Sequence, residues 1–270
     1  MPTDLPACDG LLDRPEVLAS LFHPRSGYSP SCQADILELR IPVADGIIIG
    51  GRCHRADPGA VNILFFHGNG EIAEDYDDLG PLFARRRLHF LVADYRGYGS
   101  STGSPTSSAL LADSHAILRF VIGWLRDQGH TGPLIVMGRS LGSAPALELA
   151  CHHPAAIAGL ILESSFAHTG LLLRRLGVDL AALRFEETQG FRQLDKIQTF
   201  AKPTLIIHAE YDHIIPFADG RALYAASPAR DKRRLKIPGA DHNKIFAVGW
   251  RPYPEAVETF VGHLRPGPNV

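Results

Sequence analysis

The hydrophobic pattern of the chain changes near residue 60. Upstream, two apolar runs at 36–41 and 47–53 flank Asp45-Gly46, a pair that favours a tight turn, so these runs predict an antiparallel hairpin. Downstream, six short strand-like runs are interpreted as apolar runs with little alternation, as in strands that helices cover on both faces, although 233–237 also contains three basic residues. These six runs are 61–66, 88–93, 133–138, 159–163, 204–208 and 233–237.

Segments with helical character separate these runs. Residues 106–128 place Leu111, Leu118 and Val121 on one face at helical spacing, which predicts a long helix. Residues 71–87 begin with acidic side chains and end with three arginines, a charge order that complements a helix dipole, so a helix is expected here too. Strands that alternate with helices predict an α/β fold with a mostly parallel sheet and right-handed crossovers.

One domain is expected over residues 35–265, because the chain contains no repeat, no low-complexity tract and no obvious linker. Residues 1–34 are expected to pack on this domain as an N-terminal extension, and residues 266–270 to form a tail. The segment 167–200 lies between two predicted strands and is the expected lid over a pocket. Its leucines could line an acyl site or pack a helix pair: Leu171, Leu172, Leu173, Leu176, Leu180 and Leu183.

Charge and cysteine usage restrict the classes of partner. The formal net charge is −2 with both signs interspersed, so no nucleic-acid partner is expected. The cysteines are far apart without metal-binding spacing, which favours reduced thiols: Cys8, Cys32, Cys53 and Cys151. Neither a signal-peptide pattern nor a transmembrane run is evident, so the expected location is the cytoplasm. The composition leaves the oligomeric state open.

The strongest chemical signal is the pentapeptide GRSLG at 138–142, which follows one predicted strand and precedes a helical stretch. A G-x-S-x-G pattern in this position makes a sharp turn that exposes the serine above the sheet, and its glycines leave room for the turn. An ordinary helix N-cap is the alternative role for Ser140. The placement between strand and helix favours a nucleophile.

A second signal is HGNG at 67–70, which ends another predicted strand. An acyl-transfer enzyme needs two backbone N–H donors that point at the oxyanion of its tetrahedral intermediate. Leu141, next to the serine, would provide one donor, and Asn69 in this loop of small residues would provide the other. His67 is expected to hold the loop rather than to act in catalysis.

Two further candidates follow predicted strands late in the chain. Asp212 lies just beyond 204–208, and His242 just beyond 233–237, at the edge where open α/β sheets place their active sites. The chain order serine, aspartate, histidine is the one that Ser-His-Asp triads take on such sheets, and it differs from the two protease folds. We therefore interpret His242 as the general base and Asp212 as the acid that orients it.

Three other carboxylates compete with Asp212. Glu163 ends the run 159–163, one strand earlier; Asp241 adjoins the histidine and would have to bend back to hold it; Glu210 shares the loop of Asp212. A separate candidate, DYRGYG at 94–99, could pass for a dinucleotide-binding turn. It lacks the third glycine of G-x-G-x-x-G, so we reject that interpretation.

Together these blocks resemble the α/β-hydrolase superfamily, most of all its small serine hydrolases, which include the α/β-hydrolase-domain depalmitoylases and their bacterial relatives. The resemblance spans roughly residues 35–264. It rests on six blocks in order: HGNG at 67–70, DYRGYGSS at 94–101, GRSLGS at 138–143, LESSF at 162–166, AEYDHIIP at 209–216 and PGADHN at 238–243.

The resemblance implies an α/β-hydrolase fold with an eight-stranded sheet, and a hydrolase without metal or cofactor. It assigns Ser140, Asp212 and His242 as the triad, with Leu141 and Asn69 as oxyanion donors. Membrane-bound depalmitoylases carry an N-terminal cysteine cluster, whereas this sequence has a lone cysteine near its start. That difference disfavours protein depalmitoylation.

The predicted activity is therefore that of a carboxylesterase or acyl-thioesterase on a small-molecule acyl substrate, through a Ser140 acyl-enzyme. The alternative from another class is a catalytically silent scaffold of the same fold, used for ligand binding or assembly, which would have no need of all three triad side chains. A dehalogenase of this fold would carry an aspartate where this chain has Ser140.

Overall fold

A computed structural model describes residues 10–27, 29–30 and 35–264. The expected tail at 266–270 and the first nine residues of the expected N-terminal extension lie outside the described residues, as do Cys8 and Cys32. Both described cysteines, Cys53 and Cys151, are buried free thiols.

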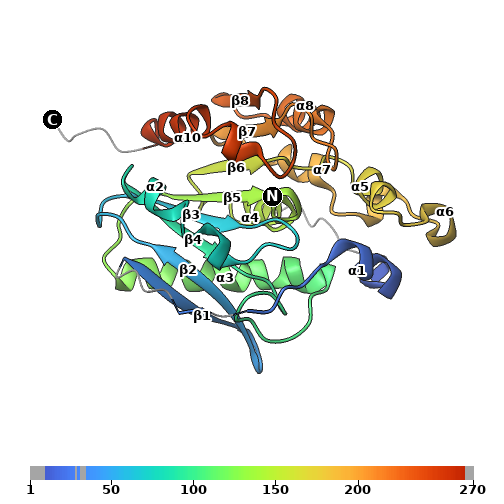
Figure 1. Ribbon diagram of the computed structural model, residues 1–270, viewed down its shortest axis with the longest axis horizontal. Helices are drawn as coiled ribbons and strands as arrows, with labels where there is room; N and C mark the ends of the chain where they lie inside the picture. The colour runs from blue at the N-terminus through green and yellow to red at the C-terminus, as the bar shows by residue number, and fades with distance from the viewer. Residues whose placement is uncertain (1–9, 28, 31–34, 265–270) are drawn as a thin grey trace.

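The described strands form one eight-stranded sheet in the order β1-β2-β4-β3-β5-β6-β7-β8 (Figure 1). Strand β2 runs antiparallel to both of its neighbours, and the other pairings are parallel. The predicted α/β class is confirmed, and every predicted apolar run forms a strand: β1 Ile36–Ala44, β2 Ile47–His54, β3 Val61–Phe66, β4 Leu88–Ala93, β5 Leu134–Arg139, β6 Gly159–Glu163, β7 Thr204–Ala209 and β8 Lys232–Ile237.

Helices cover both faces of the sheet, so the hydrophobic core has two halves. One face packs against helices that include α3 (Ser107–Asp127), α4 (Ser143–His152) and α8 (Phe217–Ala226). The other packs against shorter elements: η2 (Ala73–Tyr76), α2 (Gly80–Ala84), α9 (Ile245–Val248) and α10 (Pro252–Gly262). Strands β3 to β7 are therefore buried along their whole length, whereas the edge strand β8 is largely half-buried or exposed.

The prediction of one continuous helix over 71–87 is wrong. The segment forms the short η2 and α2, and Arg87 adopts a left-handed backbone just before β4. The physical reason is Gly80-Pro81, because proline has no N–H to donate and is tolerated only in the first turn of a helix. Pro81 lies in the first turn of α2.

The segment expected to be a lid contains four short helical pieces: α5 Thr169–Arg175, α6 Leu180–Leu183, η4 Glu187–Gln189 and α7 Gln193–Ile197. The last of these packs on α4 and α8 and so belongs to the body. Helices α5 and α6 instead extend to one end of the molecule, where α5 contacts the N-terminal α1 (Pro15–Leu21), preceded by η1 (Gly10–Asp13) (Figure 1). Two segments far apart in the chain thus meet at this end of the molecule.

Helix α3 corrects the expectation that no segment is long and apolar enough to cross a membrane. Within the described part of the chain it alone meets those criteria of length and composition. Core helices of globular proteins meet the same criteria, and α3 packs its Leu118 and Val121 face into the core. The helix is thus a weak sign of a membrane span.

Candidate active site

The turn after β5 gives Ser140 an unusual backbone. Its φ is +50°, in the left-handed region that side chains other than glycine seldom adopt. The chain turns there from β5 into η3 (Ser140–Gly142) and then α4. A Cβ on Gly138 would overlap the Gly142 carbonyl, and one on Gly142 would overlap the Phe66 carbonyl at the end of β3. Both glycines of the motif are therefore sterically required.

Three predicted side chains meet in a hydrogen-bonded row above this turn. The Nε2 atom of His242 lies 3.1 Å from the Ser140 Oγ, and its Nδ1 atom lies 2.8 Å from Asp212 Oδ2. The three residues follow β5, β7 and β8, so the carboxyl ends of parallel strands bring them together. All three are at most 9% exposed, which shields the row from bulk water.

Asp212 is held from both sides. Its second oxygen, Oδ1, accepts hydrogen bonds from the backbone N–H groups of Ile214 (3.1 Å) and Ile215 (2.8 Å). Burial alone would raise the pKa of the Asp212 carboxyl, but the hydrogen bond and charge interaction with His242, together with the Ile215 N–H, outweigh it and lower that pKa. The carboxylate therefore stays ionised opposite the imidazole.

The HGNG loop lies beside the serine, because β3 is the neighbour of β5 in the sheet. The side-chain oxygen of Asn69 accepts hydrogen bonds from the His23 N–H (2.8 Å) and the Tyr98 hydroxyl (2.7 Å). This side chain is thus used to anchor the loop. Both Asn69 and Leu141 border the same cavity as Ser140, where their backbone N–H groups are the candidate oxyanion donors.

His67 is a structural residue, in line with the sequence prediction. Its ring is fully buried, with Nε2 3.2 Å from Asp94 Oδ1 and Nδ1 2.8 Å from the Gly68 carbonyl. Tyr95 packs against the ring and donates a hydrogen bond from its hydroxyl to the His67 carbonyl (2.5 Å). The histidine therefore braces the turn from β3 into the loop.

Each rival carboxylate has another partner. Glu163 accepts hydrogen bonds from Arg139 Nη1 (2.6 Å) and from the Tyr253 hydroxyl (2.5 Å). Asp241 caps the two backbone N–H groups that follow His242 in the chain. Glu210 pairs with the Lys236 ammonium (2.5 Å) and with a backbone N–H. Asp212 is thus the carboxylate in contact with the imidazole.

Sequence reasoning missed two residues of the site, Arg139 and Glu71. Arg139 is the second residue of G-x-S-x-G, and its Nε donates to Glu71 Oε1 at 2.8 Å. Glu71 directly follows the HGNG motif and accepts a hydrogen bond from the Gly68 N–H at 2.6 Å. The available signal was one charged residue inside the G-x-S-x-G motif and another next to the HGNG motif, but no pattern linked the two residues.

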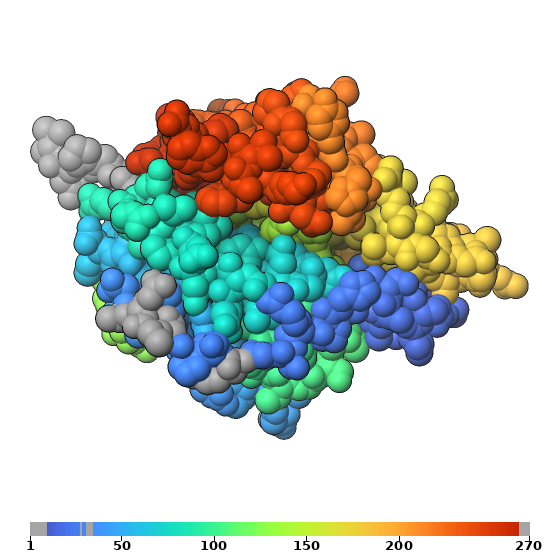
Figure 2. Space-filling view, viewed as in Figure 1, coloured from blue at the N-terminus to red at the C-terminus, as the bar shows by residue number. Residues whose placement is uncertain are grey.

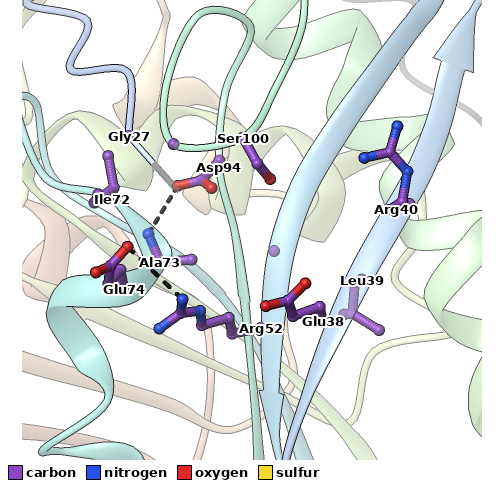
Figure 3. Close-up of a pocket in the computed structure, with 12 residues that line it drawn as sticks. Gly27, Glu38, Leu39, Arg40, Arg52, Ile72, Ala73, Glu74, Asp94 and Ser100 are labelled. Atoms are coloured by element: carbon purple, nitrogen blue, oxygen red, sulfur yellow. Dashed lines mark hydrogen bonds and ion pairs between the residues drawn. The ribbon is translucent and has the colours of Figure 1, made fainter. Parts of the chain in front are cut away.

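A cavity of about 310 Å³ opens elsewhere, between the hairpin and the η2 segment (Figure 3). Arg52 points into it but is paired with Glu74, and Asp94 accepts a hydrogen bond from the Ala73 N–H. The described residues that line it include no histidine or cysteine, so they offer no serine–histidine pair like that at Ser140.

The cavity at Ser140 measures about 220 Å³ and has two kinds of wall. Leu172 and Leu176 of the lid segment and Ile214 form an apolar side, and Asn69 and Glu71 belong to a polar side. The space-filling view shows a hollow between the cyan segment that follows β3 and the orange-red C-terminal part of the chain (Figure 2). Of the lid leucines, Leu172 and Leu176 thus line the site, while Leu173 and Leu183 pack into the core.

A second cavity of about 390 Å³ borders the first, with Glu71, Arg139 and Asn243 lining both. Leucines of the α2 region and aromatic side chains form much of its wall: Leu79, Leu82, Tyr76, Phe246 and Tyr253. Ser140 therefore lies at a cavity with an apolar side. Beyond the Arg139–Glu71 pair lies a larger cavity that apolar and charged side chains line together.

One cluster of possible metal ligands lies at the far end of α4 from Ser140. Donor atoms of His115, Glu148 and His152 lie within 4.8 Å of one another. The Lys196 ammonium already pairs with the Glu148 carboxylate at 2.6 Å, and His115 contacts its other oxygen at 3.3 Å. Protein groups thus balance the charge of this carboxylate.

Comparison with known proteins places these features in a family. A sequence model of the alpha/beta hydrolase fold matches residues 61–195. Alpha/beta hydrolase domain-containing protein 17C of Xenopus tropicalis is 31% identical over 236 residues, which cover 82% of this chain and 68% of the relative.

Solved structures of two enzymes share the fold. The esterase Pf2001 of Pyrococcus furiosus matches with a TM-score of 0.71 at 17% identity, over 89% of this chain and 98% of the esterase. A soluble variant of monoglyceride lipase from Saccharomyces cerevisiae, in complex with a substrate analog, has a TM-score of 0.69 at 18% identity, with coverages of 89% and 98%.

The tight turn predicts a stability effect for Gly142→Ala. We expect the free energy of unfolding to fall by about 1–3 kcal/mol, because the added methyl overlaps backbone that cannot rotate away. Urea denaturation measures this change. Gly123→Ala on α3, where a Cβ meets nothing within 4 Å, is the control and should instead stabilise by about 0.5–1 kcal/mol. Equal effects of the two substitutions would contradict the steric argument.

Glu71 predicts a pH effect on stability. Burial raises the pKa of its carboxyl, but Arg139 and Tyr76 outweigh this and lower the pKa from 4.5 to about 2. Because the folded-state pKa is depressed, the stabilisation is complete above pH 4.5 and is lost as the pH falls from 4.5 towards 2. The stability curves of wild type and Glu71→Gln should therefore converge in that range. A difference independent of pH would refute this prediction.

Proposed function

Because the chain belongs to the α/β-hydrolase fold family, we propose that it is a serine hydrolase that cleaves a carboxylic ester or thioester. The observation that carries the proposal is the row Ser140 Oγ, His242 Nε2, His242 Nδ1 and Asp212 Oδ2, with contacts of 3.1 and 2.8 Å. In an activated nucleophile, a hydroxyl lies beside a general base, and a carboxylate orients that base. The row has this arrangement.

In the proposed reaction, His242 Nε2 takes the proton of Ser140 as Oγ attacks the carbonyl carbon of the substrate. Asp212 holds the imidazole with its proton on Nδ1 and stabilises the imidazolium that forms. The backbone N–H groups of Leu141 and Asn69 would donate to the oxyanion. His242 then protonates the departing alcohol or thiol. In the second half it activates a water that releases the acyl group from Ser140.

The two cavities suggest how the substrate lies. We infer that the acyl group enters the apolar side formed by Leu172, Leu176 and Ile214, and that the leaving group extends over Arg139 and Glu71 towards the second cavity. At about 220 Å³ the first cavity is smaller than the roughly 300–1,000 Å³ of typical small-molecule sites. It therefore favours a short or medium acyl chain.

The nucleophile is tested by covalent labelling. A fluorophosphonate probe should modify Ser140, because this serine combines a neighbouring base with oxyanion donors. Peptide mapping identifies the site. Ser140→Ala should abolish labelling and lower kcat by on the order of 10⁴-fold or more. A folded wild-type protein that resists the probe would favour the silent scaffold, and labelling of another serine would move the nucleophile.

The acid is tested by Asp212→Asn. We expect kcat to fall by about 10³–10⁴-fold, since an amide holds the imidazole in the wrong tautomer while it preserves the geometry. Steady-state kinetics on a p-nitrophenyl ester measure the loss. Glu210→Gln on the same loop is the control, because Glu210 pairs with Lys236 rather than with the imidazole. A similar loss in both variants would argue against Asp212.

The acyl preference is tested with esters from acetyl to palmitoyl, each below its micelle-forming concentration. Every methylene that fits should strengthen transition-state binding by roughly 0.8 kcal/mol and raise kcat/KM accordingly. The gain should stop where the cavity ends. Leu176→Ala should move this limit to longer chains, because Leu176 lines the apolar side. A steady rise through palmitoyl in the wild type would overturn the inferred chain length.

A further inference from the structure

The side chain of Arg139 connects three separate segments of the site. It is 8% exposed, and each of its guanidinium nitrogens donates a hydrogen bond. Nε donates to Glu71 Oε1 (2.8 Å), Nη1 to Glu163 Oε1 (2.6 Å) and Nη2 to the backbone carbonyl of His242 (3.0 Å). These three bonds fix the orientation of the guanidinium, so Arg139 is well placed to act on the reaction through the residues that it holds.

The bond to His242 fixes the loop that carries the base. A carbonyl held at 3.0 Å restricts where the His242 backbone can lie, and thus how far Nε2 lies from the Ser140 Oγ. The guanidinium is itself held in place by Glu163, which the Tyr253 hydroxyl anchors at 2.5 Å. The base is therefore braced against the end of β6.

The bond to Glu71 reaches the other loop of the site. Glu71 uses one oxygen for Arg139 and the other for the Gly68 N–H and the Tyr76 hydroxyl, both at 2.6 Å. Gly68 directly precedes Asn69, the candidate oxyanion donor. The Arg139 side chain, next to Ser140 in the sequence, thus contacts the loop of His242 directly. It contacts the HGNG loop through the Glu71 carboxylate.

We propose that Arg139 is a positioning residue that sets the alignment of His242 and of the Asn69 loop relative to Ser140. The inference rests on the proposed serine-hydrolase function and adds a residue to it. Arginine suits the role because its planar guanidinium donates in several fixed directions, whereas lysine offers a compact point charge on a flexible stem. Arg139→Lys keeps the positive charge that the buried carboxylates need but loses this fixed geometry.

The chain offers a matched control in Arg52. Its side chain is 6% exposed, pairs with Asp77 and Glu74, and donates to the backbone carbonyl of Ser29, away from the Ser140 cavity. Arg52→Lys therefore repeats the same loss of geometry at a buried arginine outside the site. Thermal unfolding of both variants shows whether their destabilisation is comparable.

For Arg139→Lys we expect kcat on a p-nitrophenyl ester to fall by about 10–100-fold with KM within threefold of wild type, since small misplacements of catalytic groups cost this much. Arg52→Lys should keep kcat within about twofold. The low-field proton NMR signal of the His242 Nδ1–H bond to Asp212 should shift or broaden in Arg139→Lys and persist in Arg52→Lys. A purely structural role would not separate the variants in this way.

Glu71→Gln distinguishes the link from Arg139 to the HGNG loop from its link to His242. It weakens the link to Gly68 but leaves Nη2 of Arg139 on the His242 carbonyl, so kcat should fall several-fold with the His242 signal unchanged. If Arg139→Lys does not fold, Tyr253→Phe replaces it, because it loosens Glu163 and hence the guanidinium. It should lower kcat several-fold and alter the signal, and a wild-type kcat in this variant would overturn the proposal.

Equal kcat values in Arg139→Lys and Arg52→Lys, or a lowered kcat in Arg139→Lys with the His242 signal intact, would also overturn it. Failure of the proposed function looks different. In that case the wild type itself resists the fluorophosphonate probe and hydrolyses no ester. The NMR comparison of the two lysine variants still decides whether Arg139 positions His242.

Discussion

The left-handed backbone of Ser140 is the constraint on which the site depends. At a φ of +50° the chain leaves β5 and enters η3 without an intervening loop. This is possible because Gly142 lies directly against the carbonyl of Phe66, the last residue of β3. The same close approach sets the serine against the HGNG loop that follows β3. The position of the proposed nucleophile relative to the HGNG loop is therefore a property of strand packing.

A second consequence concerns charge. The turn places Arg139 inside the protein, where an unpaired cation would be costly, and two carboxylates compensate it. Loss of either Arg139 or Glu163 would leave the other as a buried charge without this partner, so these side chains depend on one another. Glu163, a rival acid by its position at a strand end, is committed to this group. That leaves Asp212, with its backbone donors, to face His242.

Much of the fold could be predicted because strands that are buried on both faces of a sheet appear in the sequence as short apolar runs. The segment 71–87 was mispredicted because its charge order favoured a helix, whereas the local effect of Gly80-Pro81 prevailed. The proximity of Ser140, Asp212 and His242 could be predicted from their places after strands. The partners of Arg139 could not, because they lie 24, 68 and 103 residues away and share no pattern with it.

The hydrogen bond from the His23 N–H to Asn69 gives the segment before the sheet a part in the site. The groups that meet around Ser140 are thus drawn from position 23 to position 242, nearly the whole span of the described chain. During synthesis the segment that steadies the HGNG loop emerges early, and His242, the proposed base, emerges late. If the proposed triad is the active site, a nascent chain should stay inactive until β8, the last described strand, has joined the sheet and placed His242.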